Sequence, residues 1–158
     1  MLTTKDAQWL SLCNDGSKIF STCAKKQFFC LIVNEHNQII GQGYNGVPPN
    51  MQHCIDGGCP RYINNVASGT PYDTGLGICY SAHAEQNALS RGQSLEFHKS
   101  TLYINGFPCF NCAKQIASSG IKRICAIDEP DRINKENTLW LFEKASIELL
   151  TVIGIDND

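Results

Sequence analysis

Two short strings of the chain carry residue types that bind catalytic zinc. The first, H-A-E, begins with His83, and the second, P-C-F-N-C, contains Cys109 and Cys112. Catalytic zinc takes three protein ligands and keeps one coordination position open for water. Either string alone is a weak signal, because C-x-x-C also occurs in redox pairs and in halves of structural zinc sites. Together they predict one zinc ion held by His83, Cys109 and Cys112, with the carboxylate of Glu85 beside it.

Glu85 is predicted to carry protons rather than to bind the metal. It stands two residues after His83, so on a regular helix the two side chains diverge. Zinc lowers the pKa of a bound water toward neutrality. One carboxylate can then take a proton from that water and deliver protons to a ring nitrogen and a departing amine. The competing interpretations are ordinary ones, a solvated helix glutamate and a buried, hydrogen-bonded histidine.

Composition narrows the class of protein. The chain has 158 residues, 42% of them hydrophobic, with a formal net charge of -2, which predicts one globular domain over residues 1–158. This charge favours no nucleic-acid or membrane partner. The first residues are polar and no apolar run is long enough to span a bilayer, so we expect a cytoplasmic protein. Nine cysteines in such a compartment favour metal ligands and buried thiols over disulfides.

The hydrophobic pattern predicts alternating elements around these strings. Ser81 is the expected N-cap of the helix that carries His83, and Gly120 the expected C-cap of the helix that carries both zinc-binding cysteines. Residues 47–77 are rich in Gly, Pro and Asn and too long for an ordinary connection. After residue 80, strands and helices alternate, which is typical of α/β layering. The expected helices are 5–20, 81–91, 109–119 and 135–150, and the expected strands 28–33, 39–40, 101–104, 123–127 and 151–153.

The wider sequence resembles the deoxycytidylate (dCMP) deaminase family of zinc-dependent deaminases. H-x-E followed by P-C-x-x-C is the signature of the superfamily. The narrower resemblance covers residues 5–155 and is carried by S-T-C at 21–23, G-Y-N-G-V-P at 43–48, H-A-E-Q-N-A-L at 83–89 and S-G-I-K at 119–122. It implies a three-layer α/β/α cytidine deaminase-like fold, with a central mixed sheet of about five strands.

The same resemblance implies an activity and its partners. The implied reaction is hydrolysis of dCMP to dUMP and ammonia, by a homo-oligomer that is often a hexamer. Activation by dCTP and inhibition by dTTP, with Mg²⁺ accompanying the triphosphate, are further implications. Asn45 would contact the sugar hydroxyl and the backbone at Ala84 the base carbonyl. Tyr103 and Asn87 are weaker candidates for the nucleotide pocket, since either could serve packing or capping instead.

The remaining cysteines fall into two groups. Cys13, Cys30 and Cys125 lie in apolar surroundings and are expected to be small buried side chains. The others lie on or beside the long polar segment, and soft ligands converging there would suit a closed, structural zinc. The resemblance supports such a second zinc, and a set of uncoordinated thiols is the alternative. The proposed ligands are Cys23, Cys54, Cys59 and Cys79, with His53 as a substitute for one of them.

Other functions stay open at this stage. The resembling family often has arginine where this chain has Lys25 followed by Lys26, and lysine lacks the bidentate fork that grips phosphate. A deaminase of dCTP, of both nucleotides or of a free cytosine nucleoside is therefore the main alternative. A nucleic-acid-editing deaminase would need basic and aromatic surface around its pocket. A non-catalytic zinc module would have no use for Glu85.

Overall fold

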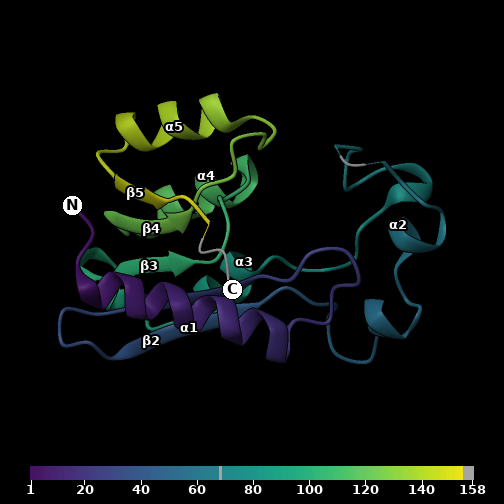
Figure 1. Ribbon diagram of the computed structural model, residues 1–158, viewed down its shortest axis with the longest axis horizontal. Helices are drawn as coiled ribbons and strands as arrows, with labels where there is room; N and C mark the ends of the chain where they lie inside the picture. The colour runs from purple at the N-terminus through teal and green to yellow at the C-terminus, as the bar shows by residue number, and fades with distance from the viewer. Residues whose placement is uncertain (68, 155–158) are drawn as a thin grey trace.

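The computed structural model describes residues 1–67 and 69–154, and its centre is a five-stranded mixed sheet (Figure 1). The strand order is β2-β1-β3-β4-β5. β1 pairs antiparallel with both β2 and β3, whereas β3, β4 and β5 run parallel. The strands are β1 (Phe29–Val33), β2 (Ile39–Tyr44), β3 (Thr101–Ile104), β4 (Arg123–Ile127) and β5 (Glu148–Val152).

Helices cover both faces of the sheet, which confirms the predicted three-layer α/β/α architecture. α1 (Thr4–Phe20) lies against one face, and α3 (Ala84–Arg91), α4 (Phe110–Ser119) and α5 (Lys135–Lys144) lie against the other (Figure 1). The alternation of side chains along a strand divides the core in two. In β3, Leu102 and Ile104 pack under α3 and α4, whereas Tyr103 packs under α1.

The long polar segment between β2 and α3 forms a separate excursion at one end of the sheet (Figure 1). It contains a short helix, α2 (Pro60–Ile63), and two 3₁₀ turns, η1 (Cys54–Asp56) and η2 (Gly75–Gly77). A further 3₁₀ stretch, η3 (Ser94–Lys99), follows α3. The excursion returns to the sheet immediately before α3, so it ends at the predicted zinc-binding histidine.

Most of the predicted elements are confirmed, but several boundaries are wrong, among them the end of β2, which continues past the expected strand 39–40 to Tyr44. Gly120 ends α4 in the left-handed conformation, with φ 94°, as predicted. Ser81 is not the N-cap of α3, because the chain stays extended as far as His83, which takes that position. No helix in the described ranges is both long and apolar enough to cross a membrane.

The C-terminal helix is six residues shorter than the pattern predicts. α5 ends at Lys144, and a left-handed residue, Ser146 with φ 54°, reverses the chain. The N–H of Ile147 donates to the carbonyl of Phe142 at 2.9 Å, and the N–H of Ser146 donates to that of Glu143 at 3.1 Å. This pair of bonds is a Schellman ending, which usually uses glycine. The apolar residues that follow belong to β5 instead, which replaces the expected strand 151–153.

Candidate active site

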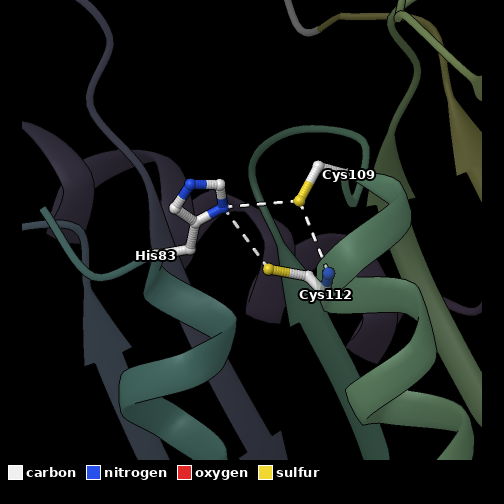
Figure 2. A group of neighbouring side chains, drawn as sticks. All are labelled: His83, Cys109 and Cys112. Carbon is white, nitrogen blue, oxygen red and sulfur yellow. Dashed lines mark hydrogen bonds between the residues drawn. The ribbon is translucent and has the colours of Figure 1, made fainter. Parts of the chain in front are cut away.

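The predicted zinc ligands meet where two helices begin. His83 is the N-cap of α3, and Cys109 is the N-cap of α4, one turn before Cys112 (Figure 2). The side chain of Gln86 accepts a hydrogen bond from the N–H of His83 at 2.8 Å. The sulfur of Cys109 accepts from the N–H of Cys112 at 3.4 Å. Helix N-termini favour negative charge, so both local structures prepare the cysteines to act as thiolates.

The geometry of these three side chains fits one tetrahedral zinc ion. Nδ1 of His83 lies 3.5 Å from Sγ of Cys109 and 3.4 Å from Sγ of Cys112 (Figure 2). Ordinary zinc–nitrogen and zinc–sulfur bond lengths at a tetrahedral angle place nitrogen and sulfur about 3.5 Å apart. All three donor atoms lie within 4.8 Å of one another. Three ligands leave the fourth position open, as in a catalytic site.

The two thiols are electrostatically unequal. The hydrogen bond from Cys112 lowers the pKa of Cys109 to about 3, with the contact to His83 adding to the effect. The same hydrogen bond, together with burial, raises the pKa of Cys112. These contacts favour the thiolate form of Cys109, and the bond to Cys109 in turn raises the pKa of His83. Metal binding releases the remaining thiol proton, because only the thiolate is a zinc ligand.

Glu85 is buried beside this cluster in the first turn of α3, with 4% of its surface exposed. Burial raises the pKa of its carboxyl, while the nearby positive charge of His83 opposes the rise. None of the ion pairs among residues 1–67 and 69–154 includes Glu85. A carboxyl with a raised pKa exchanges protons more readily near neutral pH, which is the property that a general acid and base needs.

The G-Y-N-G string holds α3 in place. A side chain at Gly43 would bring a Cβ within 2.5 Å of the backbone nitrogen of Ala88, so only glycine lets β2 and α3 approach this closely. Gly46 then exchanges two backbone hydrogen bonds with Ala82, at 3.2 and 2.9 Å. Because Ala82 immediately precedes His83, this bridge attaches the zinc-binding histidine to the end of β2.

Asn45 lies in the same string and is buried. Its Oδ1 accepts from the hydroxyl of Ser21 and from the N–H of Phe28, and its Nδ2 donates to the carbonyl of Lys26 at 2.7 Å. The side chain therefore joins the end of α1 to the start of β1. An amide nitrogen carries two hydrogens, and the bond to Lys26 uses one of them.

The other three residues predicted to contact the nucleotide lie in different parts of the fold. Ala84 is fully buried as the first residue of α3, directly beside His83. Asn87 donates to the carbonyl of Tyr44 at 2.8 Å and so ties α3 to β2. Tyr103 points to the opposite face of the sheet, where its hydroxyl donates to Asp6 at 2.7 Å. The expectation that Tyr103 lines the nucleotide pocket is wrong, because the strand alternation turns it toward α1.

The second group of cysteines lies in the excursion, except for Cys23, which lies in the loop between α1 and β1. Burial raises the pKa of Cys54 to about 12, and the neighbouring thiol of Cys59 is the next cause, followed by Cys23 and Cys79. The thiols of Cys59, Cys23 and Cys79 thus lie near Cys54, although Cys23 is distant from it in sequence. His53 is exposed instead. In the described part of the chain, the metal-binding group whose donor atoms all lie within 4.8 Å of one another is His83, Cys109 and Cys112. The four cysteines of the second group do not meet this criterion and are more widely spaced.

Arg132 is a cation near the site that no motif in the sequence predicts. The positive charge of Arg132 acts on both Glu85 and His83 and lowers the pKa of each, although larger causes raise both. Arg132 follows β4, and the loop beyond the carboxyl end of a parallel strand is a common place for functional residues. Its neighbour Glu129 accepts from the N–H of Phe107 at 3.1 Å, next to the loop that leads to the zinc-binding cysteines.

Comparison with known families and proteins agrees with this geometry. Residues 3–127 match the family described as the cytidine and deoxycytidylate deaminase zinc-binding region. The chain is 32% identical over 138 residues to the deoxycytidylate deaminase of Schizosaccharomyces pombe, covering 87% of this chain and 41% of that protein. It is 33% identical over 105 residues to the deoxycytidylate deaminase of Mycobacterium phage D29, covering 66% of this chain and 80% of that protein.

A solved structure shares the fold. The dCMP deaminase of cyanophage S-TIM5, crystallised in complex with dCMP and dUMP, aligns with a TM-score of 0.67 at 19% identity, covering 96% of this chain and 99% of that one. The match includes all three layers of the molecule. The chain therefore spans nearly the whole of a phage structure but less than half the length of the yeast relative.

Proposed function

The chain belongs to the cytidine and deoxycytidylate deaminase zinc-binding family, and on that premise we propose that it hydrolyses dCMP to dUMP and ammonia. The observation that carries the proposal is the three-ligand cluster of His83, Cys109 and Cys112 with the buried carboxylate of Glu85 beside it. The names of the relatives support dCMP as the substrate.

The residues of the site divide the work of hydrolysis. Zinc held by the three ligands would supply Lewis-acid activation of the attacking water. Glu85 accepts a proton from this water as its oxygen attacks C4 of the cytosine ring. Glu85 passes this proton to the adjacent ring nitrogen, then takes the second proton from the hydroxyl added at C4 and delivers it to the amino group, so that ammonia leaves and the C4 carbonyl forms. Because the Glu85 pKa is raised by burial, the carboxyl can both accept and return protons near neutral pH.

Three further residues are proposed to hold the nucleotide. Asn45 keeps one amide hydrogen for the sugar hydroxyl, and the backbone at Ala84 lies beside His83, where the base carbonyl would sit. Asn87 is proposed as a supporting residue that fixes α3 against β2. The phosphate is assigned to the basic side chains at the start of β1. There Lys26 pairs with a carboxylate of Glu129 at 2.7 Å, with which a phosphate would compete.

An ammonia-release assay tests the substrate. Wild-type protein is offered deoxycytidine, CMP, dCMP and dCTP separately, each with and without Mg²⁺. We expect the highest kcat/KM for dCMP. Faster turnover of free deoxycytidine would overturn the nucleotide assignment, and equal or faster turnover of dCTP would replace dCMP with a triphosphate substrate.

A second, structural zinc is proposed at Cys23, Cys54, Cys59 and Cys79. The mutual effects of these thiols on the Cys54 pKa support it, as does the exposure of His53, which favours the four-cysteine set. Elemental analysis of protein purified without chelator should give two zinc ions per chain. Cys54→Ser should remove one of them, while Cys13→Ser, at a buried thiol of α1, should remove none. One zinc per wild-type chain at full activity would refute the second site.

The remaining expectations about partners and regulation are also proposals. Exposed apolar side chains on α1 and α5, such as Ile19, Phe20 and Trp140, support a homo-oligomer, for which a hexamer is the expected form. Activation by dCTP with Mg²⁺ and inhibition by dTTP are checked in the ammonia-release assay by adding either triphosphate to dCMP. All nine cysteines are thiols rather than disulfides, which supports the reducing environment of a cytoplasm.

A further inference from the structure

The ring of His83 has a neighbour that the proposed mechanism does not use. Tyr72, in the excursion before α3, meets the imidazole edge-on, with ring centroids 5.7 Å apart and ring planes at 84°. A metal ligand must present one nitrogen in a fixed direction, and groups packed behind it usually set that direction. Tyr72 is placed to do this, although about half of its own surface is exposed.

Tyr72 is itself held by a buried cation. The guanidinium of Arg61, from α2, lies over the Tyr72 ring with Cζ 4.6 Å from the centroid. Arg61 has 5% of its surface exposed, far less than is usual for arginine. Its nitrogens donate to three carbonyl oxygens of the loop, those of Thr70 at 3.0 Å, Pro71 at 3.0 Å and Gly77 at 2.5 Å.

These contacts hold residues 70–77 against the side chain of Arg61. The N–H of Cys79 also donates to the carbonyl of Tyr72 at 2.8 Å, which fixes the backbone on the other side of the ring. Among the ion pairs of the described ranges, none includes Arg61. Burying a cation without a carboxylate is unfavourable unless hydrogen bonds and a ring face compensate it. Here both compensations come from the segment that carries Tyr72.

We propose that Arg61 and Tyr72 are positioning residues for the catalytic metal site. Arg61 orders residues 70–77, and the ring of Tyr72 then restricts the imidazole of His83 to the orientation that aims Nδ1 at the two cysteines. Lysine could not replace Arg61, because the fork geometry of the guanidinium serves three carbonyls at once. The inference rests on the proposed function only for its activity readout, since metal binding can be measured without substrate.

Metal exchange tests the role of Tyr72. Wild type, Tyr72→Leu and Tyr72→Phe are loaded with zinc, and its release to an excess of chelator is timed. The cobalt-substituted proteins are compared by their visible absorption. Loss of an outer support for a metal ligand typically costs 10- to 100-fold in metal affinity or activity. For Tyr72→Leu we expect zinc release about 10-fold faster, an altered cobalt spectrum and a lower kcat with little change in KM. Tyr72→Phe should retain wild-type values, because it keeps the ring.

Tyr62→Leu is the matched control, since Tyr62 is an exposed tyrosine in α2 that makes no ring contact with His83 in the described structure. Arg61→Lys keeps the charge but loses the fork, and should shift zinc release in the same direction as Tyr72→Leu. Circular dichroism verifies folding. If Tyr72→Leu does not fold, Arg61→Lys decides.

Wild-type zinc release and an unchanged cobalt spectrum in the folded test variant would overturn the inference. An equal change in Tyr62→Leu would also overturn it. A third outcome separates the two proposals. If Tyr72→Leu alters metal exchange but the wild-type protein deaminates no cytosine nucleotide, the proposed function is refuted and the positioning role stands.

Discussion

Two buried carboxylates, one on each face of the sheet, have opposite properties. Asp6, in the first turn of α1, and Glu85, in the first turn of α3, are 2% and 4% exposed. Yet the pKa of Asp6 is held well below its usual range, chiefly by hydrogen bonds from Arg123, whereas burial raises the pKa of Glu85. Similarly small exposure therefore accompanies opposite shifts, because hydrogen bonds from Arg123 outweigh burial at Asp6, whereas burial dominates at Glu85, which lies deeper in the protein.

The hydrogen-bond and ion-pair partners of the two carboxylates differ between the two faces of the sheet. Arg123 grips Asp6 with two nitrogens, at 2.8 and 2.9 Å, and Tyr103 and Thr3 add further hydrogen bonds. The buried charge of Asp6 is compensated by Arg123, so this pair contributes stability to the α1 face. On the other face Glu85 has no ion-pair partner in the described part of the chain, and the proposed hydrolysis needs a buried carboxyl that exchanges protons. Substituting Glu85 should therefore reduce activity, whereas substituting Asp6 should reduce stability.

The largest effect is expected at Glu85. Glu85→Gln keeps the size of the side chain but cannot carry protons, and general acid–base groups typically contribute 10²- to 10⁴-fold in rate. Because one residue here serves several proton transfers, we expect a loss of at least about 10⁴-fold in kcat for dCMP. Zinc content should be unchanged, and the thermal midpoint should be equal or higher, since an uncompensated buried carboxylate is removed.

Glu136→Gln provides the control for Glu85→Gln, because Glu136 also lies in the first turn of a helix but is exposed. It should keep wild-type turnover. Near-normal turnover of purified Glu85→Gln would show that the comparison assigns the catalytic role to the wrong carboxylate.

The next effect is a loss of stability at Asp6. Asp6→Asn leaves Arg123 partly buried without its charge partner, and removing one member of a buried pair typically costs 3–5 kcal/mol. Since Arg123 retains some solvent contact and Glu148, we expect a loss of about 3 kcal/mol in the free energy of unfolding. Urea titration at neutral pH measures it. Asp15→Asn, at an exposed position of α1, should change little. A comparable loss in kcat of folded Asp6→Asn would contradict the separation of the faces.

Both faces differ in how far the sequence predicts them. The zinc ligands could be predicted because each lies in a short string with fixed spacing, and the sheet because its strands are short apolar runs. Asp6 and Arg123 are 117 positions apart, and nothing local in either segment predicts their contact. The same limit explains Tyr103, since periodicity predicts a buried residue but not which face of the sheet it joins.

The site also contains contacts that no local pattern predicts. Tyr72 contacts His83 from a loop whose carbonyls accept from Arg61, and Arg132 acts on the site from the segment after β4. The boundary of α5 was missed for a different reason. Its left-handed ending is formed by Ser146, where glycine is the usual residue.

Acid should affect the Asp6 face in a defined range. The folded-state pKa of Asp6 lies below that of the unfolded chain, which is about 3.9. The stabilisation is therefore complete above this value and is lost as pH falls toward the lower, folded-state pKa. Wild type should lose on the order of 2 kcal/mol more than Asp6→Asn between pH 6 and pH 2. Comparing the two proteins cancels the loss of zinc in acid, which both share. Parallel curves would mean that the pair contributes nothing.

The smallest effect separates the ion pair from the helix cap that shares its carboxylate. The hydroxyl of Thr3 accepts from the N–H of Asp6 at 3.2 Å and donates to its carboxylate at 2.8 Å. Thr3→Ala removes both bonds but leaves the Thr3 N–H on the same carboxylate, so we expect a loss of about 1 kcal/mol in unfolding free energy. Thr4→Ala, one residue on and exposed, should cost less. If Thr3→Ala cost as much as Asp6→Asn, the start of α1 rather than Arg123 would be what stabilises this face. The contrast with Glu85 would then be between a capped and an uncapped carboxylate.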